Sequence, residues 1–226
     1  MVFMKITLDE RLSACANFVR ENSVLADVGT DHAYLPAFLI SNGKIKSALA
    51  CDVNEKPLES AKQTVIDAGV VDKVTLRLCD GLCGVKKDEF TDLVVAGMGG
   101  ELIIKILSDC PYIKSEKFNL VLQPMSKVYD FRKWLCENGF LIIDEKAAVA
   151  NNKVYTVINA KFVGGNTQKD EVFYHFGKLL DKTDEKAKLY IEKQKKSLVK
   201  RAKGILSSNA QDLEALEILA MLEKID

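Results

Sequence analysis

The sequence has no net charge and no long apolar run. Its 32 basic and 32 acidic side chains cancel over 226 residues, so any surface that binds a polyanion must be local. No apolar stretch reaches the length that crosses a bilayer, and the segment at 1–12 becomes charged before a signal-peptide core could form. We therefore expect a cytoplasmic protein without a membrane partner.

Metal-binding patterns are also scarce. The chain has two histidines and six cysteines, and among the cysteines only Cys79 and Cys83 lie close together. These residues do not complete a tetrahedral His/Cys set, so we expect no metal ion. Most of the cysteines are expected to be small, buried and reduced side chains.

Short apolar runs alternate with helical patterns over the first 163 residues. We expect strands at 24–28, 48–51, 74–78, 93–96, 120–122, 140–144 and 154–162. A capping box formed by Thr7 and Glu10 predicts the start of the first helix. The alternation indicates a mostly parallel sheet, and the last two strands, whose linker holds Asn151-Asn152, must pair in antiparallel fashion. We predict an α/β fold with a seven-stranded, Rossmann-like methyltransferase sheet; the assignment to methyltransferases is an analogy of fold.

The composition changes to Lys, Glu and Leu after Gly164-Gly165-Asn166. Spacings of four and three, typical of a coiled-coil seam, connect Ala187, Ile191, Gln194, Leu198, Arg201 and Ile205. A second helix carries Leu213, Leu216, Leu219 and Leu222. We therefore expect a first domain at 1–163 and a C-terminal helical hairpin at 164–226.

Acidic residues stand where three successive strands end. In open α/β sheets ligands bind beyond the carboxyl ends of the strands, and there we find Asp27 with Asp31, then Asp52, then Asp80. Asp52 is placed to accept hydrogen bonds from ribose hydroxyls, and Asp80 could bond an adenine amino group. Each acid alone is better explained as a helix cap or turn residue, but the three together favour a nucleoside pocket.

The first strand end lacks the glycines of a dinucleotide fingerprint. After Gly29 that fingerprint would place glycines near positions 31 and 34, where this chain has Asp31 and Tyr34. A carboxylate there would repel a pyrophosphate, which argues against NAD. S-adenosylmethionine fits better, because it has no phosphate and its sulfonium is positive.

At these residues the chain resembles the bacterial tRNA (adenine(22)-N1)-methyltransferase family. The more specific matches are the Gly-Thr-Asp-His-Ala-Tyr-Leu-Pro string at 29–36 and the Gly-Met-Gly-Gly string at 97–100. Further matches lie at 8–12, 52–54, 80–82 and 123–125, so the resemblance covers the first domain. It implies transfer of a methyl group from S-adenosylmethionine to N1 of an adenine in tRNA, at position 22.

The resemblance and the strand ends together assign the site residues. We expect Asp31 and Tyr34 to be catalytic: Asp31 accepts from the exocyclic amine, and Tyr34 stacks on the base unless it only packs its helix. The expected cofactor residues are Asp27, Gly29, Thr30, His32, Asp52, Val53, Asp80, Gly81, Gly97 and Met98. His32 has three further possible roles, as a contact to the base, as a contact to a phosphate, or as a hydrogen-bond donor at the start of the helix. Arg11, Gln123 and Pro124 are expected to contact the substrate.

We expect the hairpin to bind the tRNA backbone. Its first helix is rich in basic residues, of which we assign to the substrate Lys193, Lys195, Lys196, Lys200, Arg201 and Lys203. The alternative is a solvated helix face that pairs with the acidic second helix. Two other functions stay open: a methyltransferase of a small molecule or protein, and a non-catalytic nucleotide-binding scaffold. We expect a monomer or a weak dimer.

Overall fold

A computed structural model describes residues 4–165 and 167–225 and contains one seven-stranded sheet with the order β3-β2-β1-β4-β5-β7-β6. The strands are β1 Val24–Val28, β2 Ser47–Asp52, β3 Val74–Leu78, β4 Asp92–Met98, β5 Asn119–Pro124, β6 Phe140–Ala150 and β7 Lys153–Phe162. β1 to β5 pair in parallel, and β7 is antiparallel to both β5 and β6. The expected Rossmann-like methyltransferase sheet is therefore confirmed.

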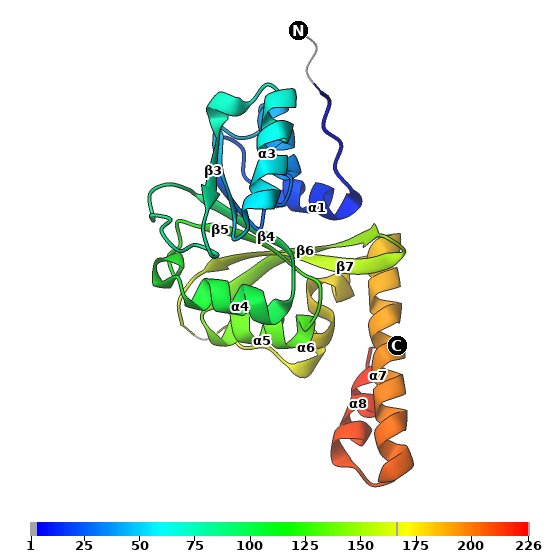
Figure 1. The fold of residues 1–226 in the computed structure, drawn as a ribbon. Coiled ribbons are helices and arrows are strands. Elements are labelled where there is room, and N and C mark those ends of the chain that lie inside the picture. The colour runs from blue at the N-terminus through cyan, green and yellow to red at the C-terminus, as the bar shows by residue number, and fades with distance from the viewer. Residues whose placement is uncertain (1–3, 166, 226) are drawn as a thin grey trace.

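The helices form layers on both faces of the sheet (Figure 1). They are α1 Glu10–Phe18, α2 Tyr34–Ser41, α3 Glu55–Asp67, α4 Gly100–Ser108, α5 Val128–Glu137, α6 Glu171–Phe176, α7 Glu185–Ser208 and α8 Leu213–Glu223, with 3₁₀ turns at Val71–Lys73, Pro111–Ile113 and Gly177–Asp181. Side chains of α1, α2 and α3 pack on one face of the sheet, and those of α4 and α5 pack on the other. Both faces of the central strands are thus buried, which explains their continuous apolar runs.

The turn between β6 and β7 follows from its two asparagines. Asn151 and Asn152 adopt left-handed backbone angles, with φ of 49° and 57°. This conformation suits a two-residue hairpin, and Asn tolerates it better than most residues. Both strands extend up to this turn, so β6 continues to Ala150, beyond the expected end at residue 144.

The predicted start of the first helix is wrong. Asp9, and not Thr7, caps α1, and its carboxylate accepts from the main-chain N–H of Leu12 at 2.7 Å. Glu10 then becomes the first helical residue and cannot close a capping box. Asp and Thr are both good cap residues, so the sequence alone did not separate the two registers.

The C-terminal helices emerge from the sheet domain and project away from it (Figure 1). Ala187 and Tyr190 near the start of α7 pack with Val154 of β7, while Leu198 and Ala202 pack against α8. The hairpin is confirmed, but the seam position of Arg201 is wrong. Arg201 is exposed and pairs with Glu214, because Ala202 takes the buried position.

The segment between the sheet and α7 was not predicted as helix. The six residues of α6 give too short a periodic pattern. Tyr174 of α6 nevertheless belongs to the same core as Phe131 of α5. Within the described ranges, no helix is both long and apolar enough to cross a membrane.

Candidate active site

A cavity of about 230 Å³ lies at the carboxyl ends of β1 and β4. It brings together many of the predicted site residues. The lining residues are Arg11, Leu12, Asp27, Gly29, Thr30, Asp31, His32, Tyr34, Leu35, Ala96 and Gly97. Leu12, Leu35 and Ala96 were not among the predicted site residues, since apolar side chains at helix or strand spacing cannot be told from ordinary core positions in a sequence.

The loop after β1 shapes this cavity through an unusual backbone. Gly29, Asp31 and Ala33 all have positive φ, at 72°, 51° and 53°. For a residue with a side chain this conformation costs about 1 kcal/mol or more, and such strain concentrates at functional sites. The folded loop leaves Asp31 and Tyr34 partly open to solvent, with exposed fractions of 70% for the Asp31 side chain and 40% for Tyr34.

The ring of His32 connects these two side chains. It stacks on the ring of Tyr34, with 5.2 Å between the ring centroids, and its Nε2 lies 3.6 Å from Oδ1 of Asp31. Tyr34 is the first residue of α2 and points its ring toward the cavity wall rather than into the core. This placement favours a ligand contact over ordinary helix packing.

Asp27 is the buried acid of the cavity. Its carboxylate accepts from the hydroxyl of Thr30 at 2.6 Å, and only 6% of the residue is exposed. Burial raises the pKa of Asp27 to about 6; the Thr30 hydrogen bond opposes this rise and the nearby Asp52 adds to it. A positively charged ligand would relieve both the burial and the repulsion.

Asp52 and Val53 lie at the end of β2, next to β1. One carboxylate oxygen of Asp52 accepts from the main-chain N–H of Asn54 at 2.9 Å, which is the local role that the sequence left open. A carboxylate has two oxygens with several acceptor sites, so this bond does not exclude a ligand. Val53 is 60% exposed, and an apolar side chain in that position offers a surface for a flat ring.

The predicted residues Asp80 and Gly81 line a different cavity. It has a volume of about 240 Å³ and lies between the loop after β3 and one side of α4, with Leu102 and Lys105 in its wall. The third strand-end acid is therefore not on the same cavity as Asp27. It belongs to a neighbouring hollow.

The Gly-Met-Gly-Gly string has a structural explanation. Gly97 has a φ of 80°, and a Cβ atom added to Gly29 would lie 2.1 Å from the methyl end of Met98, which would have to move. A side chain on Gly100 would lie 2.9 Å from the carbonyl oxygen of Ser126. These glycines let the loops after β1, β4 and β5 approach one another closely.

Gln123 does not line the cavity but supports it. Its side chain is fully buried, and its Oε1 accepts from the main-chain N–H of Gly97 and from Nη1 of Arg11, both at 3.0 Å. Pro124 is also buried and pairs in the sheet with Met98.

The predicted RNA-binding residues of the hairpin fall into two groups. Nζ of Lys193 donates to the Val154 carbonyl at 3.0 Å, and burial lowers the pKa of this lysine. Lys195 donates to the carbonyl of Ile225 at 3.2 Å, and Arg201 pairs with Glu214. The second group consists of Lys196, Lys200 and Lys203, which are exposed, as Lys193 and Arg201 also are. Lys196 in addition pairs with Glu192 at 3.5 Å.

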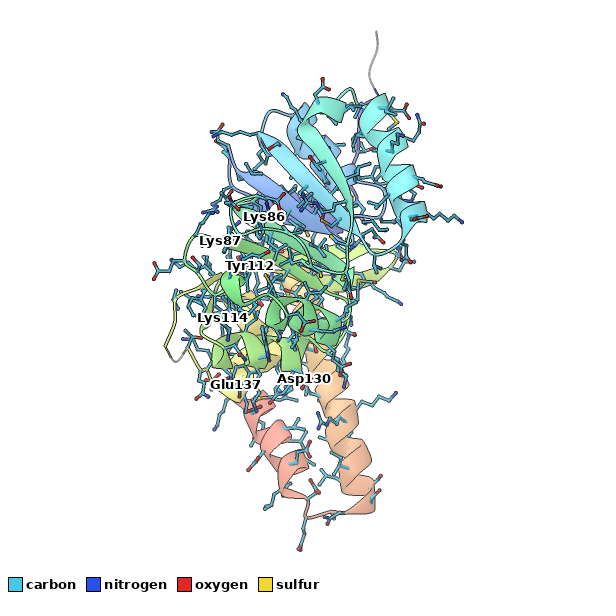
Figure 2. The ribbon with its side chains drawn as sticks, turned by 60° about the vertical axis from the view of Figure 1, so that its left-hand side comes forward. Lys86, Lys87, Tyr112, Lys114, Asp130 and Glu137 are labelled. Atoms are coloured by element: carbon cyan, nitrogen blue, oxygen red, sulfur yellow. The ribbon has the colours of Figure 1, made fainter. Side chains whose placement is uncertain are left out.

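Other lysines lie at the opposite edge of the sheet. Lys86 and Lys87 precede β4, and Lys114 precedes β5, so they belong to the amino-terminal edge of these strands. Figure 2 shows all three on one side of the sheet domain. Within 4–165 and 167–225, no group of three or more His, Cys, Asp or Glu residues is arranged to hold a metal ion.

The comparisons with known proteins agree with this geometry. A family model described as a methyltransferase domain matches residues 8–158. The tRNA (adenine(22)-N(1))-methyltransferase of Bacillus subtilis is 35% identical over 157 residues, which are 70% of this chain and 66% of that protein.

Two solved structures extend the similarity to the C-terminal helices. The B. subtilis m1A22 tRNA methyltransferase TrmK has a TM-score of 0.80 and 27% identity, covering 97% of this chain and 94% of that chain. M. capricolum TrmK, solved with the cofactor product S-adenosylhomocysteine, has a TM-score of 0.79 and 29% identity and covers 96% of each chain. This chain belongs to the methyltransferase-domain family and, within it, to the bacterial tRNA (adenine(22)-N1)-methyltransferases.

Proposed function

We propose that this protein transfers a methyl group from S-adenosylmethionine to N1 of adenine 22 in tRNA. The observation that carries this proposal is that Asp27, Asp31 and Tyr34 meet on one cavity at the carboxyl end of β1. The relatives named for this reaction support the substrate and the position. N1 of adenine is a neutral nitrogen with a free lone pair, so the enzyme needs no general base, and positioning dominates catalysis.

The cofactor extends along the strand ends in this proposal. The methionine end lies in the cavity beside Asp27, Gly29, Thr30 and Gly97, with Met98 and His32 close by. The ribose lies at Asp52 and Val53, and the adenine amino group bonds Asp80 beside Gly81. S-adenosylmethionine supplies a methyl group on a positive sulfur, and the acids along this path favour a positive ligand.

The target adenine must leave its stack to reach the cavity, because N1 lies on the base-pairing edge. This costs roughly a few kcal/mol. We assign to Asp31 the hydrogen bond from the exocyclic amine, which becomes more acidic as N1 is alkylated. Tyr34, held by the stacked ring of His32, orients the base. The main chain at Gly97 lines the same cavity.

The remaining assignments concern the tRNA and the assembly. We propose that residues 1–163 carry the catalysis and that the hairpin in 164–226 contacts phosphates through its exposed lysines, Lys196, Lys200 and Lys203. We further propose a monomer or weak dimer that works in the cytoplasm, where tRNA is found. Sedimentation at micromolar concentration tests the oligomeric state.

The decisive experiment is nucleoside mass spectrometry of unmodified tRNA transcripts incubated with the protein and S-adenosylmethionine. We expect 1-methyladenosine from a transcript with adenine at position 22 and none when that adenine is replaced by guanine. Methylation that ignores this replacement would overturn the position. No 1-methyladenosine, with cofactor binding intact, would favour a small-molecule or protein substrate.

The catalytic assignments are tested by Asp31→Asn and Tyr34→Phe with single-turnover kinetics. We expect Asp31→Asn to lower the methylation rate on the order of a hundredfold, while cofactor affinity measured by calorimetry changes little. Tyr34→Phe keeps the aromatic ring and should retain most of the rate, whereas Tyr34→Ala should not. A normal rate for Asp31→Asn would make this residue structural.

A further inference from the structure

Arg11 is the cationic wall of the cavity. Among the described residues that line it, Arg11 alone carries a permanent positive charge, and its side chain is 21% exposed. The residue lies in the first turn of α1, at one end of a helix that packs on the sheet. Burying a charge is costly, so a half-buried guanidinium is expected to have a binding partner or a function.

The protein holds this guanidinium with one neutral amide and one partly exposed carboxylate. Nη1 donates to Oε1 of Gln123 at 3.0 Å, and Gln123 is a neutral amide with no exposed surface. The nearest carboxylate is that of Asp9, which is 3.6 Å from Nη2 and 44% exposed. Its other oxygen already caps α1. An arginine has five N–H donors, so most of them remain available to a ligand.

The same amide oxygen also fixes the end of β4. Oε1 of Gln123 accepts from the main-chain N–H of Gly97, and the position of a side chain on Gly97 would be only 3.1 Å from Nη1 of Arg11. The guanidinium thus lies directly against a bare stretch of backbone at the cavity wall. Arg11 therefore lines the cavity together with residues of the loops after β1 and β4.

The charges that line the cavity are complementary to those of the methionine end of S-adenosylmethionine. The lining of the cavity includes the positive Arg11 and the buried carboxylate of Asp27. The methionine end of S-adenosylmethionine has one negative carboxylate and two positive groups, the ammonium and the sulfonium. With the cofactor turned so that its positive groups face Asp27, its carboxylate is left to Arg11.

We infer that Arg11 binds the α-carboxylate of S-adenosylmethionine and that Gln123 is the positioning residue that orients it. The inference rests on the proposed cofactor and replaces the tRNA contact that the sequence predicted for both residues. Planar guanidinium and carboxylate groups form paired, charge-assisted hydrogen bonds, which explains an arginine in this position. A tRNA phosphate is the competing partner.

The test compares two ligands by calorimetry: S-adenosylmethionine and its decarboxylated analogue, which lacks only the carboxylate. The wild-type protein should bind the analogue more weakly, on the order of tenfold to a hundredfold. Arg11→Gln keeps a polar N–H₂ group on a shorter side chain but removes the charge. It should bind S-adenosylmethionine about as weakly as the analogue, so that the preference between the two ligands disappears.

Two variants of Gln123 test its positioning role. Gln123→Leu removes the acceptor and should reduce the preference between the two ligands, and Gln123→Glu should reduce it too, because its buried carboxylate would neutralise Arg11. The control is Arg77→Gln, because Arg77 is similarly exposed at 29% but pairs with Glu89 away from the cavity. It should leave the ratio of the two affinities unchanged.

The outcomes are distinct. An unchanged preference in Arg11→Gln, or a loss of tRNA affinity at normal cofactor affinity, would overturn the assignment and indicate a phosphate contact. A wild-type protein that binds neither ligand would overturn the proposed cofactor itself. The two failures are therefore not confused.

Discussion

A buried ion pair connects the C-terminal helices to the sheet. Arg132 of α5 and Glu145 of β6 are both fully buried, with Nε and Oε1 2.8 Å apart. Glu145 also accepts from the main-chain N–H of Lys178, while Arg132 donates to the hydroxyl of Tyr190 and to main-chain carbonyls of α6. We predict that Glu145→Gln is one of the most destabilising conservative changes in this chain.

The magnitude follows from the charge that the substitution leaves behind. Burial alone would lower the pKa of Arg132, but Glu145 and Tyr190 raise it overall, so the guanidinium stays charged. In Glu145→Gln this charge loses its counterion, and an amide N–H₂ faces other donors. Removing one partner of a buried pair costs about 3–5 kcal/mol. A typical domain has only about 5–15 kcal/mol of stability in total, so the effect should be large.

Urea denaturation followed by circular dichroism measures this loss. The matched control is Glu89→Gln, which breaks the Arg77–Glu89 pair, where both side chains are about one-third exposed at 29% and 30%. Partly exposed pairs contribute about 0–1 kcal/mol. The double variant Arg132→Met with Glu145→Leu removes both charges and should recover part of the stability, because the main-chain partners of the pair then stay unsatisfied. Equal losses for Glu145→Gln and Glu89→Gln would refute the reasoning.

Three other predictions concern the ligands. Protonation of Asp27 below its pKa of about 6 removes a negative charge from the cavity, so affinity for S-adenosylmethionine should fall as the pH decreases from 7 to 5; calorimetry should show a flat profile in Asp27→Asn. Gly29→Ala should weaken both folding and cofactor binding, because the φ of 72° at this position is unfavourable for a residue with a side chain; an unchanged melting temperature would contradict this. Replacing Lys196, Lys200 and Lys203 of the hairpin by neutral residues should make the slope of log affinity for tRNA against log salt concentration less steep by about 0.9 per lost phosphate contact. The same replacement of Lys86, Lys87 and Lys114, at the amino-terminal ends of the strands, should leave the slope unchanged.

The parts of the fold that depend on local pattern were predictable from the sequence. β1 and β3 match the expected ranges because apolar runs and alternation decide a strand within a few residues. The meeting of Asp27, Asp31 and Tyr34 was predictable too, since they lie within eight positions at one strand end. The sequence did not indicate that Asp80 would line a separate hollow. A cofactor bound to all three strand-end acids must therefore extend across both cavities.

The contacts between distant segments were not predictable. Arg11 and Gln123 are 112 positions apart, and Arg132 and Tyr190 are 58 apart. The residue types do not indicate that the buried amide of Gln123 would accept a hydrogen bond from Arg11. Nor do they indicate that Arg132 of α5 would be fully buried. Such pairs depend on how the layers pack, whereas periodicity reports only which side of one element is apolar.

The first turn of α1 shows why these contacts matter for function. The carboxylate of Glu10 accepts from the main-chain N–H of Val149 at 3.2 Å and pairs with Nζ of Lys186 at 2.9 Å, so it connects the end of β6 and the start of α7. The next residue is Arg11, which lines the cavity. One helical turn therefore adjoins both the pocket proposed for the cofactor and the base of the helix proposed to hold tRNA. Because both are anchored to the same turn, the distance between the hairpin and the cavity is set by the packed fold.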